Sequence, residues 1–507
     1  MDTFTEFKQL VQEIQDLRSV QGLLGWDLET YMPQGGAETR ANQMATLAKL
    51  SHQMMTSEKM GTLLKSLEGP PLSRIDQALV RETAKDYERD IKIPVTLVQA
   101  MSEVTAKAHP IWVNARRQKQ FDLFAPILKE IIDLNRQMAE AIGYDQSPYD
   151  ALLDLYEPKL TVQQVDTLFS RLKKDLVPLV KAIRESNTKP DAGFLRQGEY
   201  PEDKQWEFTL MVLESMGFDF KRGRQDKAAH PFTMGMGPGD VRLTTRVFKQ
   251  DIVSALFSSI HEGGHGLYEQ GVDPALSRTF LDGGASLGIH ESQSRLWENL
   301  IGRSKGFWQH FYPKLQPMFE SLKDISCDQF YRALNSVEPS FIRVEADEVT
   351  YNLHIMLRYE IEKSLIEGDL NVADVPEVWS KKMQEYLGIT PPDDALGCLQ
   401  DVHWSHGSFG YFPTYTLGNL YSVQFFNTAK KQLPDLEAGI AQGELLPLKT
   451  WLNEQVHRLS RVETPDEIVQ RVTGEPLNSQ YFVDYLWQKY GGFLTLPSSP
   501  QEEKRAG

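Results

Sequence analysis

Two histidines and a glutamate stand together inside an apolar stretch near the middle of the chain. The pentapeptide His-Glu-Gly-Gly-His occupies positions 261–265, and the run before it, residues 251–260, has the apolar spacing of a helix that enters the interior. Residues four apart on a helix share one face, so His261 and His265 can reach a single metal ion. Glu262 then stands beside the remaining metal position, where a water molecule is activated. The rest of the chain must therefore fold around a buried metal helix.

Two glycines in the middle of this helix need a reason. Gly263 and Gly264 each cost about 1 kcal/mol at such a position. That cost is tolerated where something approaches the backbone closely, and we expect a substrate or a packed strand there. The alternative, a surface helix with solvated side chains, conflicts with the apolar flanks of the motif.

The chain shows helical periodicity nearly throughout and has no long linker, low-complexity segment or internal repeat. Its 507 residues are enough to bury a large core. We expect residues 1–507 to form one mostly helical catalytic domain, with two lobes around a cleft. Amphipathic helices are predicted over 4–67 and 74–142, and a loop over 188–206.

One segment is predicted as a strand. Residues 231–240 are too rich in glycine and proline for a helix interior, and residues 241–248 alternate and are β-branched. This strand comes just before the metal helix, where an edge strand can pair with an extended peptide substrate. The alternative is a small structural hairpin.

The formal net charge of −16 disfavours nucleic acid and anionic membranes as partners. The only two cysteines, Cys327 and Cys398, lie outside any C-x-x-C motif, so reduced and buried thiols are expected. The N-terminal residues lack the basic and apolar regions of a signal peptide, and no apolar run reaches the length of a membrane span. These features predict a cytoplasmic protein.

A catalytic zinc usually has three protein ligands and one open position. Glu269 is four residues beyond His265, but each four-residue step climbs about 6 Å along the helix axis, so Glu269 cannot join both histidines on one ion. The ligand should come from another helix. The stretch 283–300 begins with a glycine-rich turn and then offers His290 or Glu291, which point about 100° apart. The residues alone favour Glu291 only slightly.

Several separated motifs resemble those of the carboxypeptidase Taq family of metallocarboxypeptidases, and the match covers nearly the whole chain. They stand in the family's order: His230-Pro231-Phe232, Asp240-Val-Arg242-Leu-Thr244, His261-Glu262-x-x-His265, His290-Glu291-Ser292-Gln293, Ile342-Arg343-Val-Glu-Ala346-Asp347 and Gly397-Cys-Leu-Gln400-Asp401-Val-His403-Trp404.

The resemblance implies that Glu291 is the third metal ligand. It also implies an almost entirely helical fold with a deep cleft and a small sheet beside the metal helix, similar to angiotensin-converting enzyme and neurolysin. Homodimers and broad removal of C-terminal residues are implied as well. Many zinc peptidases with a Glu ligand carry an Asp four residues later that holds a ligand histidine, whereas this chain has Arg295 there. We therefore expect another carboxylate in that role, with Asp347 and Glu345 as candidates.

Peptide hydrolysis needs a donor for the oxyanion, and an exopeptidase must also bind the substrate's free carboxylate. The segment 406–415 resembles the oxyanion loop of neurolysin-like enzymes, with Gly407 and Gly410 expected to let it flex. The candidate donors are His406, Tyr411 and Tyr415, and the alternative for each is aromatic core packing.

A guanidinium suits the carboxylate through paired hydrogen bonds, which points to Arg343 and Arg242. The alternative for Arg343 is an ion pair with Asp347. Further residues are expected along the substrate channel: His230, Gln400 and His403 as lining, with Pro231 and Phe232 shaping it.

The sequence thus predicts a zinc-dependent carboxypeptidase that acts on peptides, in which Glu262 assists the attack of water. Co²⁺ or Mn²⁺ can occupy a site of two histidines and a glutamate in place of Zn²⁺. One alternative is an oligopeptidase that cuts internally with the same metal chemistry. Another is a non-catalytic peptide-binding scaffold, which the presence of Glu262 and a full ligand set disfavours.

Overall fold

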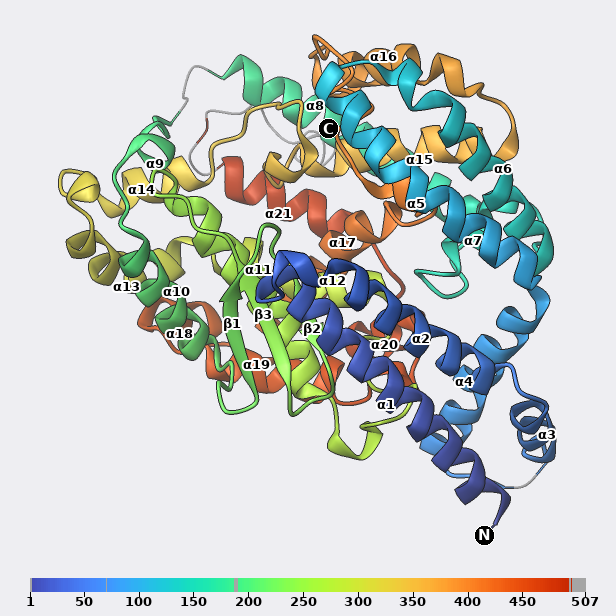
Figure 1. The fold of residues 1–507 in the computed structure, drawn as a ribbon. Coiled ribbons are helices and arrows are strands. Elements are labelled where there is room, and N and C mark those ends of the chain that lie inside the picture. The colour runs from blue at the N-terminus through green and yellow to red at the C-terminus, as the bar shows by residue number, and fades with distance from the viewer. Residues whose placement is uncertain (1, 70, 187–189, 492–493, 495–507) are drawn as a thin grey trace, which may run out of the picture. The chain divides into compact units, whose positions relative to one another are not determined.

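The computed structural model of the chain describes residues 2–69, 71–186, 190–491 and 494. Most of them are helical, and the strands form one small sheet beside the helix that carries the His-Glu-Gly-Gly-His motif, as expected (Figure 1). Within these ranges every helix is too short or too polar to cross a bilayer. Cys327 and Cys398 are both free thiols, the first half-buried and the second buried.

The chain divides into two compact units, each made of separated segments. Unit 1 comprises Met1–Ile91, Asp191–Leu334 and Tyr421–Leu477, and unit 2 comprises Lys92–Pro190, Asn335–Leu420 and Asn478–Gly507. One of the points at which the chain passes from one unit to the other, between Leu420 and Tyr421, falls within α17 (Pro413–Gln432). The cleft expected between two lobes stays a prediction.

Unit 1 contains the three strands and the metal helix. Its helices are α1 (Thr3–Thr30), α2 (Ala37–Met55), α3 (Glu58–Ser66), α4 (Arg74–Lys92), α9 (Phe194–Gln197), α10 (Glu202–Met216), α11 (Ile252–Gly271), α12 (Leu287–Arg295), α13 (Lys305–Leu315), α14 (Cys327–Leu334), α18 (Leu436–Gln442), α19 (Leu446–Leu452) and α20 (Pro465–Thr473).

Unit 2 is helical. Its helices are α5 (Val95–Gln118), α6 (Ala125–Ile142), α7 (Pro148–Leu153), α8 (Val162–Glu185), α15 (Tyr351–Glu367), α16 (Val375–Leu387) and α21 (Gln480–Gly491).

The predicted helical stretches 4–67 and 74–142 are confirmed as α1–α3 and α4–α6. The predicted loop over 188–206 holds only in part, because α9 interrupts it and α10 begins at Glu202. Residues 187–189 lie outside the described residues.

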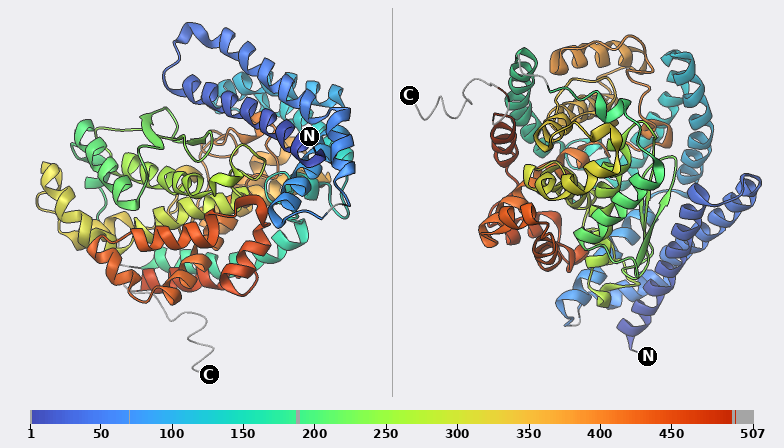
Figure 2. Two further views of the ribbon diagram at one scale, coloured as in Figure 1. Left: turned by 90° about the horizontal axis from the view of Figure 1, so that it is seen from below. Right: turned by 90° about the vertical axis from the view of Figure 1, so that its left-hand side faces the viewer.

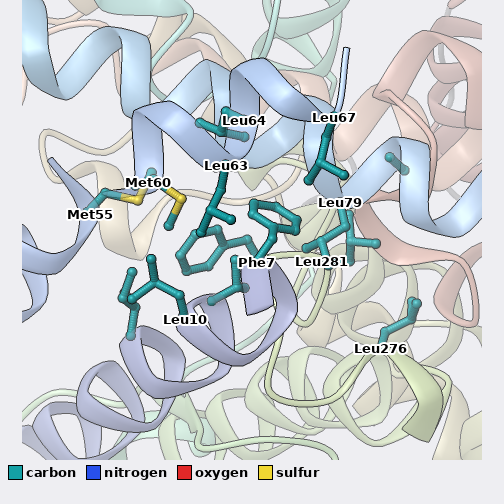
Figure 3. Close-up of a cluster of buried hydrophobic side chains, with 14 of the residues drawn as sticks. Phe7, Leu10, Met55, Met60, Leu63, Leu64, Leu67, Leu79, Leu276 and Leu281 are labelled. Atoms are coloured by element: carbon teal, nitrogen blue, oxygen red, sulfur yellow. The ribbon is translucent and has the colours of Figure 1, made fainter. Parts of the chain in front are cut away.

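An apolar cluster anchors the N-terminal helices of unit 1. In two further views α1 and α2 run side by side (Figure 2). The N-terminal part of α1 and the C-terminal end of α2 join α3 and α4 in this cluster, which includes Phe7 and Leu63. The cluster also takes in Leu276 and Leu281, from the segment between α11 and α12 (Figure 3). Because full burial of one such side chain contributes about 1.5–3 kcal/mol, this packing fixes the segment that leads from α11 to α12.

The sheet has the strand order β1-β3-β2 and packs against α11 (Figure 1). Strand β1 (Gly223–Lys227) is parallel to β3 (Val241–Thr245), and β2 (Thr233–Gly235) is antiparallel to β3. The strand predicted over 241–248 therefore exists but ends at Thr245. It is the central strand, so its backbone is paired on both sides, and the expectation that it forms an edge for a peptide is wrong. Strand β2 pairs only with β3, so it is an edge strand of the sheet.

Candidate metal centre and substrate-binding residues

Helix α11 begins at a capped turn and runs into the interior of unit 1. The side chain of Asp251 accepts hydrogen bonds from the backbone N–H groups of Val253 and Ser254 at 2.8 and 3.0 Å, which satisfies two donors that a helix start leaves free. Ten residues further on, the motif is surrounded by protein, and Glu262 is only 7% exposed. The predicted buried metal helix is thus present as α11.

The two glycines of the motif allow neighbouring helices to approach α11. A Cβ atom on Gly263 would lie 2.5 Å from Leu213 of α10, and one on Gly264 would lie 2.7 Å from the backbone of Gln293 and Ser294 in α12. Neither contact is sterically possible without displacement. The expected close approach is real, but helices make it rather than a substrate or a strand.

Three donor atoms of unit 1 converge. Nε2 of His261 lies 3.6 Å from Oε2 of Glu291, and Nε2 of His265 lies 3.4 Å from the same oxygen. All three donors lie within 4.8 Å of one another. Bonds of about 2.1 Å to a tetrahedral zinc place its donor atoms about 3.4 Å apart, so these residues fit such an ion. Glu269 lies outside the group, as the helix geometry requires.

Glu291 is held in place by its own helix. Its Oε1 accepts a hydrogen bond from Nε of Arg295 at 2.6 Å, and its Oε2 accepts one from the hydroxyl of Ser294 at 3.0 Å. Burial alone would raise the pKa of this carboxyl, but Arg295 and the two histidines hold it well below its ordinary range. Arg295, noted above as a departure from a related pattern, therefore keeps Glu291 ionised and oriented.

The carboxylate behind His261 is Glu298. It lies in the π-helical segment η4 (Leu296–Ile301) that follows α12, and its Oε2 is 2.8 Å from Nδ1 of His261. Burial opposes its charge, yet Arg295 and His261 lower the pKa of Glu298 to about 2. The candidates Asp347 and Glu345 do not fill this role. Glu298 could have been found as the acidic residue seven positions, or two turns, after Glu291.

His290 and Glu269, the two other candidates for the third ligand, lie behind His265. Nδ1 of His290 lies 2.5 Å from Nδ1 of His265, and Nε2 of His290 lies 2.7 Å from Oε1 of Glu269. Burial lowers the pKa of His265 to about 4, which keeps the imidazole neutral, as a metal ligand must be.

The carboxylate of Glu262 is in contact with the edge strand. The hydroxyl of Thr233 in β2 lies 2.7 Å from its Oε2, and burial raises the pKa of Glu262 above its ordinary value. A carboxyl with a raised pKa is better suited to take up a proton near neutral pH.

Arg242 and His230, the two candidate substrate-binding residues of unit 1, differ from the expectation in what surrounds their side chains. Arg242 donates to both carboxylate oxygens of Asp240 at 2.9 and 2.8 Å, and its guanidinium stacks over Trp26 at 4.3 Å. His230 is exposed. The paired contacts of Arg242 favour a structural role for it.

In unit 2 the guanidinium of Arg343 is buried against a different carboxylate from the one expected. Its Nε and Nη2 donate to Oδ1 of Asp401 at 3.0 and 2.8 Å, and its Nη1 donates to the hydroxyl of Tyr351 at 2.9 Å. Asp347 instead accepts from backbone N–H groups of its own turn. Asp401 also pairs with the fully buried Arg358 at 2.6 Å, so two guanidinium groups share one carboxylate.

Gln400 supports the Arg343 segment through the backbone. Its Oε1 accepts from the N–H of Arg343 at 2.8 Å, and its Nε2 donates to the carbonyl oxygens of Phe341 and Gly397. Both ends of the amide are thus taken up by main-chain groups, which favours a scaffolding role over lining a channel.

Three further candidates gather beside Arg343. Nε2 of His403 lies 3.3 Å from the hydroxyl of Tyr415, whose ring lies 4.9 Å from the Arg343 guanidinium. The ring of Tyr411 lies 5.3 Å from both His403 and Tyr415. Burial lowers the pKa of His403 to about 4, so this imidazole is neutral at pH 7.

His406 does not join this group. Its side chain is exposed and stacks on the ring of His109 at 5.5 Å. Of the candidates His403, His406, Tyr411 and Tyr415, the structure brings together all but His406.

The loop that carries these residues is tied down at its centre. Oε2 of the buried Glu362 accepts from the N–H of Gly410 at 3.0 Å, and Oε1 accepts from Nε1 of Trp404 at 2.7 Å. Gly407 and Gly410 have φ values of 74° and 88°, which an L-residue with a side chain rarely adopts. The glycines are therefore required by the shape of this loop, whatever its mobility.

A mostly helical fold with His-Glu-x-x-His on a buried helix and a third donor from the next helix has the construction of a metallopeptidase. The comparisons make the class specific: the chain belongs to the carboxypeptidase Taq (M32) metallopeptidase family, whose model matches residues 6–490. It is a metal-dependent carboxypeptidase, and the family implies a divalent metal and peptide substrates.

The relatives match along nearly their whole length. Carboxypeptidase 1 of Bacillus subtilis is 44% identical, over 97% of this chain and 98% of that protein. Thermostable carboxypeptidase 1 of Thermus thermophilus is 44% identical, over 94% and 95%. A solved structure of the Pyrococcus furiosus carboxypeptidase superimposes with a TM-score of 0.95 at 38% identity, covering 97% of this chain and 99% of that one. Because these relatives, which match along nearly their whole length, are carboxypeptidases, the alternative of an oligopeptidase that cuts internally is not favoured.

Proposed function

We propose that the chain is a zinc-dependent exopeptidase of broad specificity that releases amino acids one at a time from peptide C-termini. The observation that carries the proposal is the convergence of His261, His265 and Glu291 next to the buried carboxylate of Glu262. When bound there, Zn²⁺ supplies Lewis-acid chemistry: it lowers the pKa of a water molecule and polarises the substrate carbonyl. Co²⁺ and Mn²⁺ are possible substitutes.

Glu262 is the proposed general base. Its carboxylate takes the proton from the attacking water and returns it to the leaving amine, which requires a group able to hold a proton between the two steps. The raised pKa caused by burial supports this role. The hydroxyl of Thr233 at 2.7 Å limits the rotation of the carboxylate.

Arg343 is the proposed recognition group for the free α-carboxylate. Asp401 carries one negative charge between two guanidinium groups, so the cluster has a surplus positive charge in a buried setting, which favours an anionic ligand. Tyr411 and Tyr415, in the same unit, are proposed donors to the oxyanion, with His403 as a neutral neighbour. The roles proposed from sequence for His406, Arg242, His230 and Gln400 have less support from their contacts.

The family match runs through both units, so we propose that residues 1–507 act as a single catalytic domain. We also propose a homodimer in the cytoplasm, as the resemblance and the composition suggest. Sedimentation equilibrium of the purified protein tests the oligomeric state.

C-terminal amidation tests the exopeptidase mechanism. Matched peptides with a free or an amidated C-terminus are incubated with zinc-reconstituted protein, and the products are identified by mass spectrometry. The proposal expects stepwise loss of C-terminal residues from the free acid and little turnover of the amide. Equal cleavage of both at internal bonds would refute it. Metal analysis of protein purified without chelators tests the choice of zinc.

A further inference from the structure

Two titratable residues that the catalytic scheme does not use form a hydrogen-bonded chain behind a metal-ligand candidate. Starting from His265, the chain runs from Nδ1 to Nδ1 of His290 at 2.5 Å and then from Nε2 of His290 to Oε1 of Glu269 at 2.7 Å. Glu269 lies on α11 itself, one turn beyond His265, and His290 lies on α12. The chain therefore ties the two site helices together.

The direction of these hydrogen bonds follows from the ligand geometry. Nε2 of His265 faces Glu291 and must keep its lone pair for the metal, so the proton of the neutral ring is on Nδ1. That N–H donates to Nδ1 of His290, whose own proton is then on Nε2 and is donated to Glu269. Each contact thus has one donor and one acceptor.

The fold leaves space for this chain. A Cβ atom on Gly284 would lie 2.5 Å from the ring of His290, and one on Gly235 of β2 would lie 2.8 Å from a carboxylate oxygen of Glu269. The ring of Tyr268 covers His290 at 5.1 Å. Two glycines and an aromatic ring around a polar chain indicate a built arrangement rather than an incidental contact.

We propose that His290 and Glu269 are positioning residues that hold His265 with Nε2 directed at the metal. This inference rests on the proposed role of His265 as a ligand. It gives the two ligand histidines different supports: His261 is oriented directly by Glu298, whereas His265 is oriented by Glu269 through His290. Partners behind metal-binding histidines fix the ring and its tautomer, and their loss typically lowers metal affinity about 10- to 100-fold.

The test measures Zn²⁺ affinity of the full chain by competition with a chelator of known affinity. His290→Leu and Glu269→Leu should each lower the affinity about 10- to 100-fold. Glu269→Gln keeps an acceptor oxygen for His290 and should retain most of the affinity. The double variant His290→Leu/Glu269→Leu should lose no more than the weaker-binding single variant, because both changes break one chain.

Controls separate a specific effect from a general one. Asp282 is half-buried and is not part of the hydrogen-bonded chain. Partial burial, followed by the charge of Glu269, raises the pKa of Asp282 to about 6. Asp282→Asn should leave Zn²⁺ affinity within about twofold. His290→Asn places an amide oxygen near the position of Nδ1, so it tests the link to His265 if His290→Leu does not fold.

Glu291→Ala distinguishes failure of the inference from failure of the proposed function. If Glu291→Ala binds Zn²⁺ as tightly as the parent, the ligand set itself is wrong. If Glu291→Ala loses Zn²⁺ but the His290 and Glu269 variants bind normally, the ligand set stands and the positioning role is overturned. Additive losses in the double variant would likewise contradict a single chain.

Discussion

The hydroxyl oxygen of Thr233 lies 2.7 Å from Oε2 of Glu262 and 3.0 Å from the backbone carbonyl oxygen of Glu262. The edge strand β2 thus reaches the carboxylate that is proposed to move the proton. A hydroxyl at this position restricts Glu262 to one orientation, and positioned proton transfer contributes about 10²–10⁴-fold to catalysis.

Thr233→Val removes the hydroxyl and keeps the side-chain shape, whereas Thr233→Ser keeps the hydroxyl. We expect Thr233→Val to lower kcat about 10- to 100-fold with little change in KM, and Thr233→Ser to retain most of the activity. Steady-state kinetics on one free-acid peptide measures both constants. A loss of similar size in both variants would mean that packing, and not the hydrogen bond, matters here.

Arg343→Ala should lower kcat/KM for free-acid peptides about tenfold to more than a hundredfold, since a charge-assisted paired contact contributes about 1.5–3 kcal/mol. Lysine should rescue only in part, because it lacks the planar fork. Amidated peptides should be poor substrates of the parent and lose little more in the variant. Equal losses for acid and amide would show that Arg343 only supports the structure as the partner of Asp401.

Asp401→Asn should destabilise the fold by about 3–5 kcal/mol, because two buried guanidinium groups lose their shared countercharge. Burial opposes ionisation of Asp401, yet Arg343 and Arg358 hold its pKa far below the ordinary 3.8. The stability that depends on this depressed pKa is present above about pH 4 and is lost as the pH falls below that value.

Urea unfolding of parent and Asp401→Asn between pH 3 and 8 checks the sign. The difference in the free energy of unfolding should be constant from about pH 5 upward and should shrink below about pH 4. A difference that grew toward low pH would contradict the assignment.

Gly264→Ala should disturb the site without touching a polar group. Its Cβ atom would lie 2.7 Å from the backbone of α12, so the helix that carries Glu291 must shift, at a cost of about 1–3 kcal/mol or more. We expect a lower melting temperature and weaker metal binding. Gly239→Ala is the matched control, because a Cβ atom there has no neighbour within 4 Å. Equal effects of the two changes would argue against close helix packing at Gly264.

Local pattern was enough to predict the mostly helical fold, the metal helix and one strand just before it, whereas the small sheet itself was implied by the family resemblance. The 3.6-residue spacing of apolar residues and the His-Glu-x-x-His motif are short-range signals. The order of the strands in the sheet has no comparable short-range pattern in the sequence. Val241–Thr245 alternates as a half-buried strand does, and alternation does not distinguish a central strand from an edge strand. In the structure β1 and β2 pair with it on either side.

Contacts between distant positions account for what the sequence did not reveal. Arg343 pairs with Asp401, 58 positions away, instead of the nearby Asp347. Glu298 lies in the π-helical segment that follows α12, and it contacts His261, which is 37 positions earlier in the chain. His290 and Glu269 each have the chemistry of a ligand, and only the contacts of His290 with His265 and with Glu269 show that the two residues lie behind His265.

The account depends most directly on Glu262 as the group that moves the proton. Glu262→Gln keeps the size of the side chain and leaves His261, His265 and Glu291 unchanged. The measurement is kcat on a free-acid peptide together with bound zinc per chain for the same preparation. The account predicts unchanged zinc and a loss of several orders of magnitude in kcat. Near-normal kcat with unchanged zinc would contradict it.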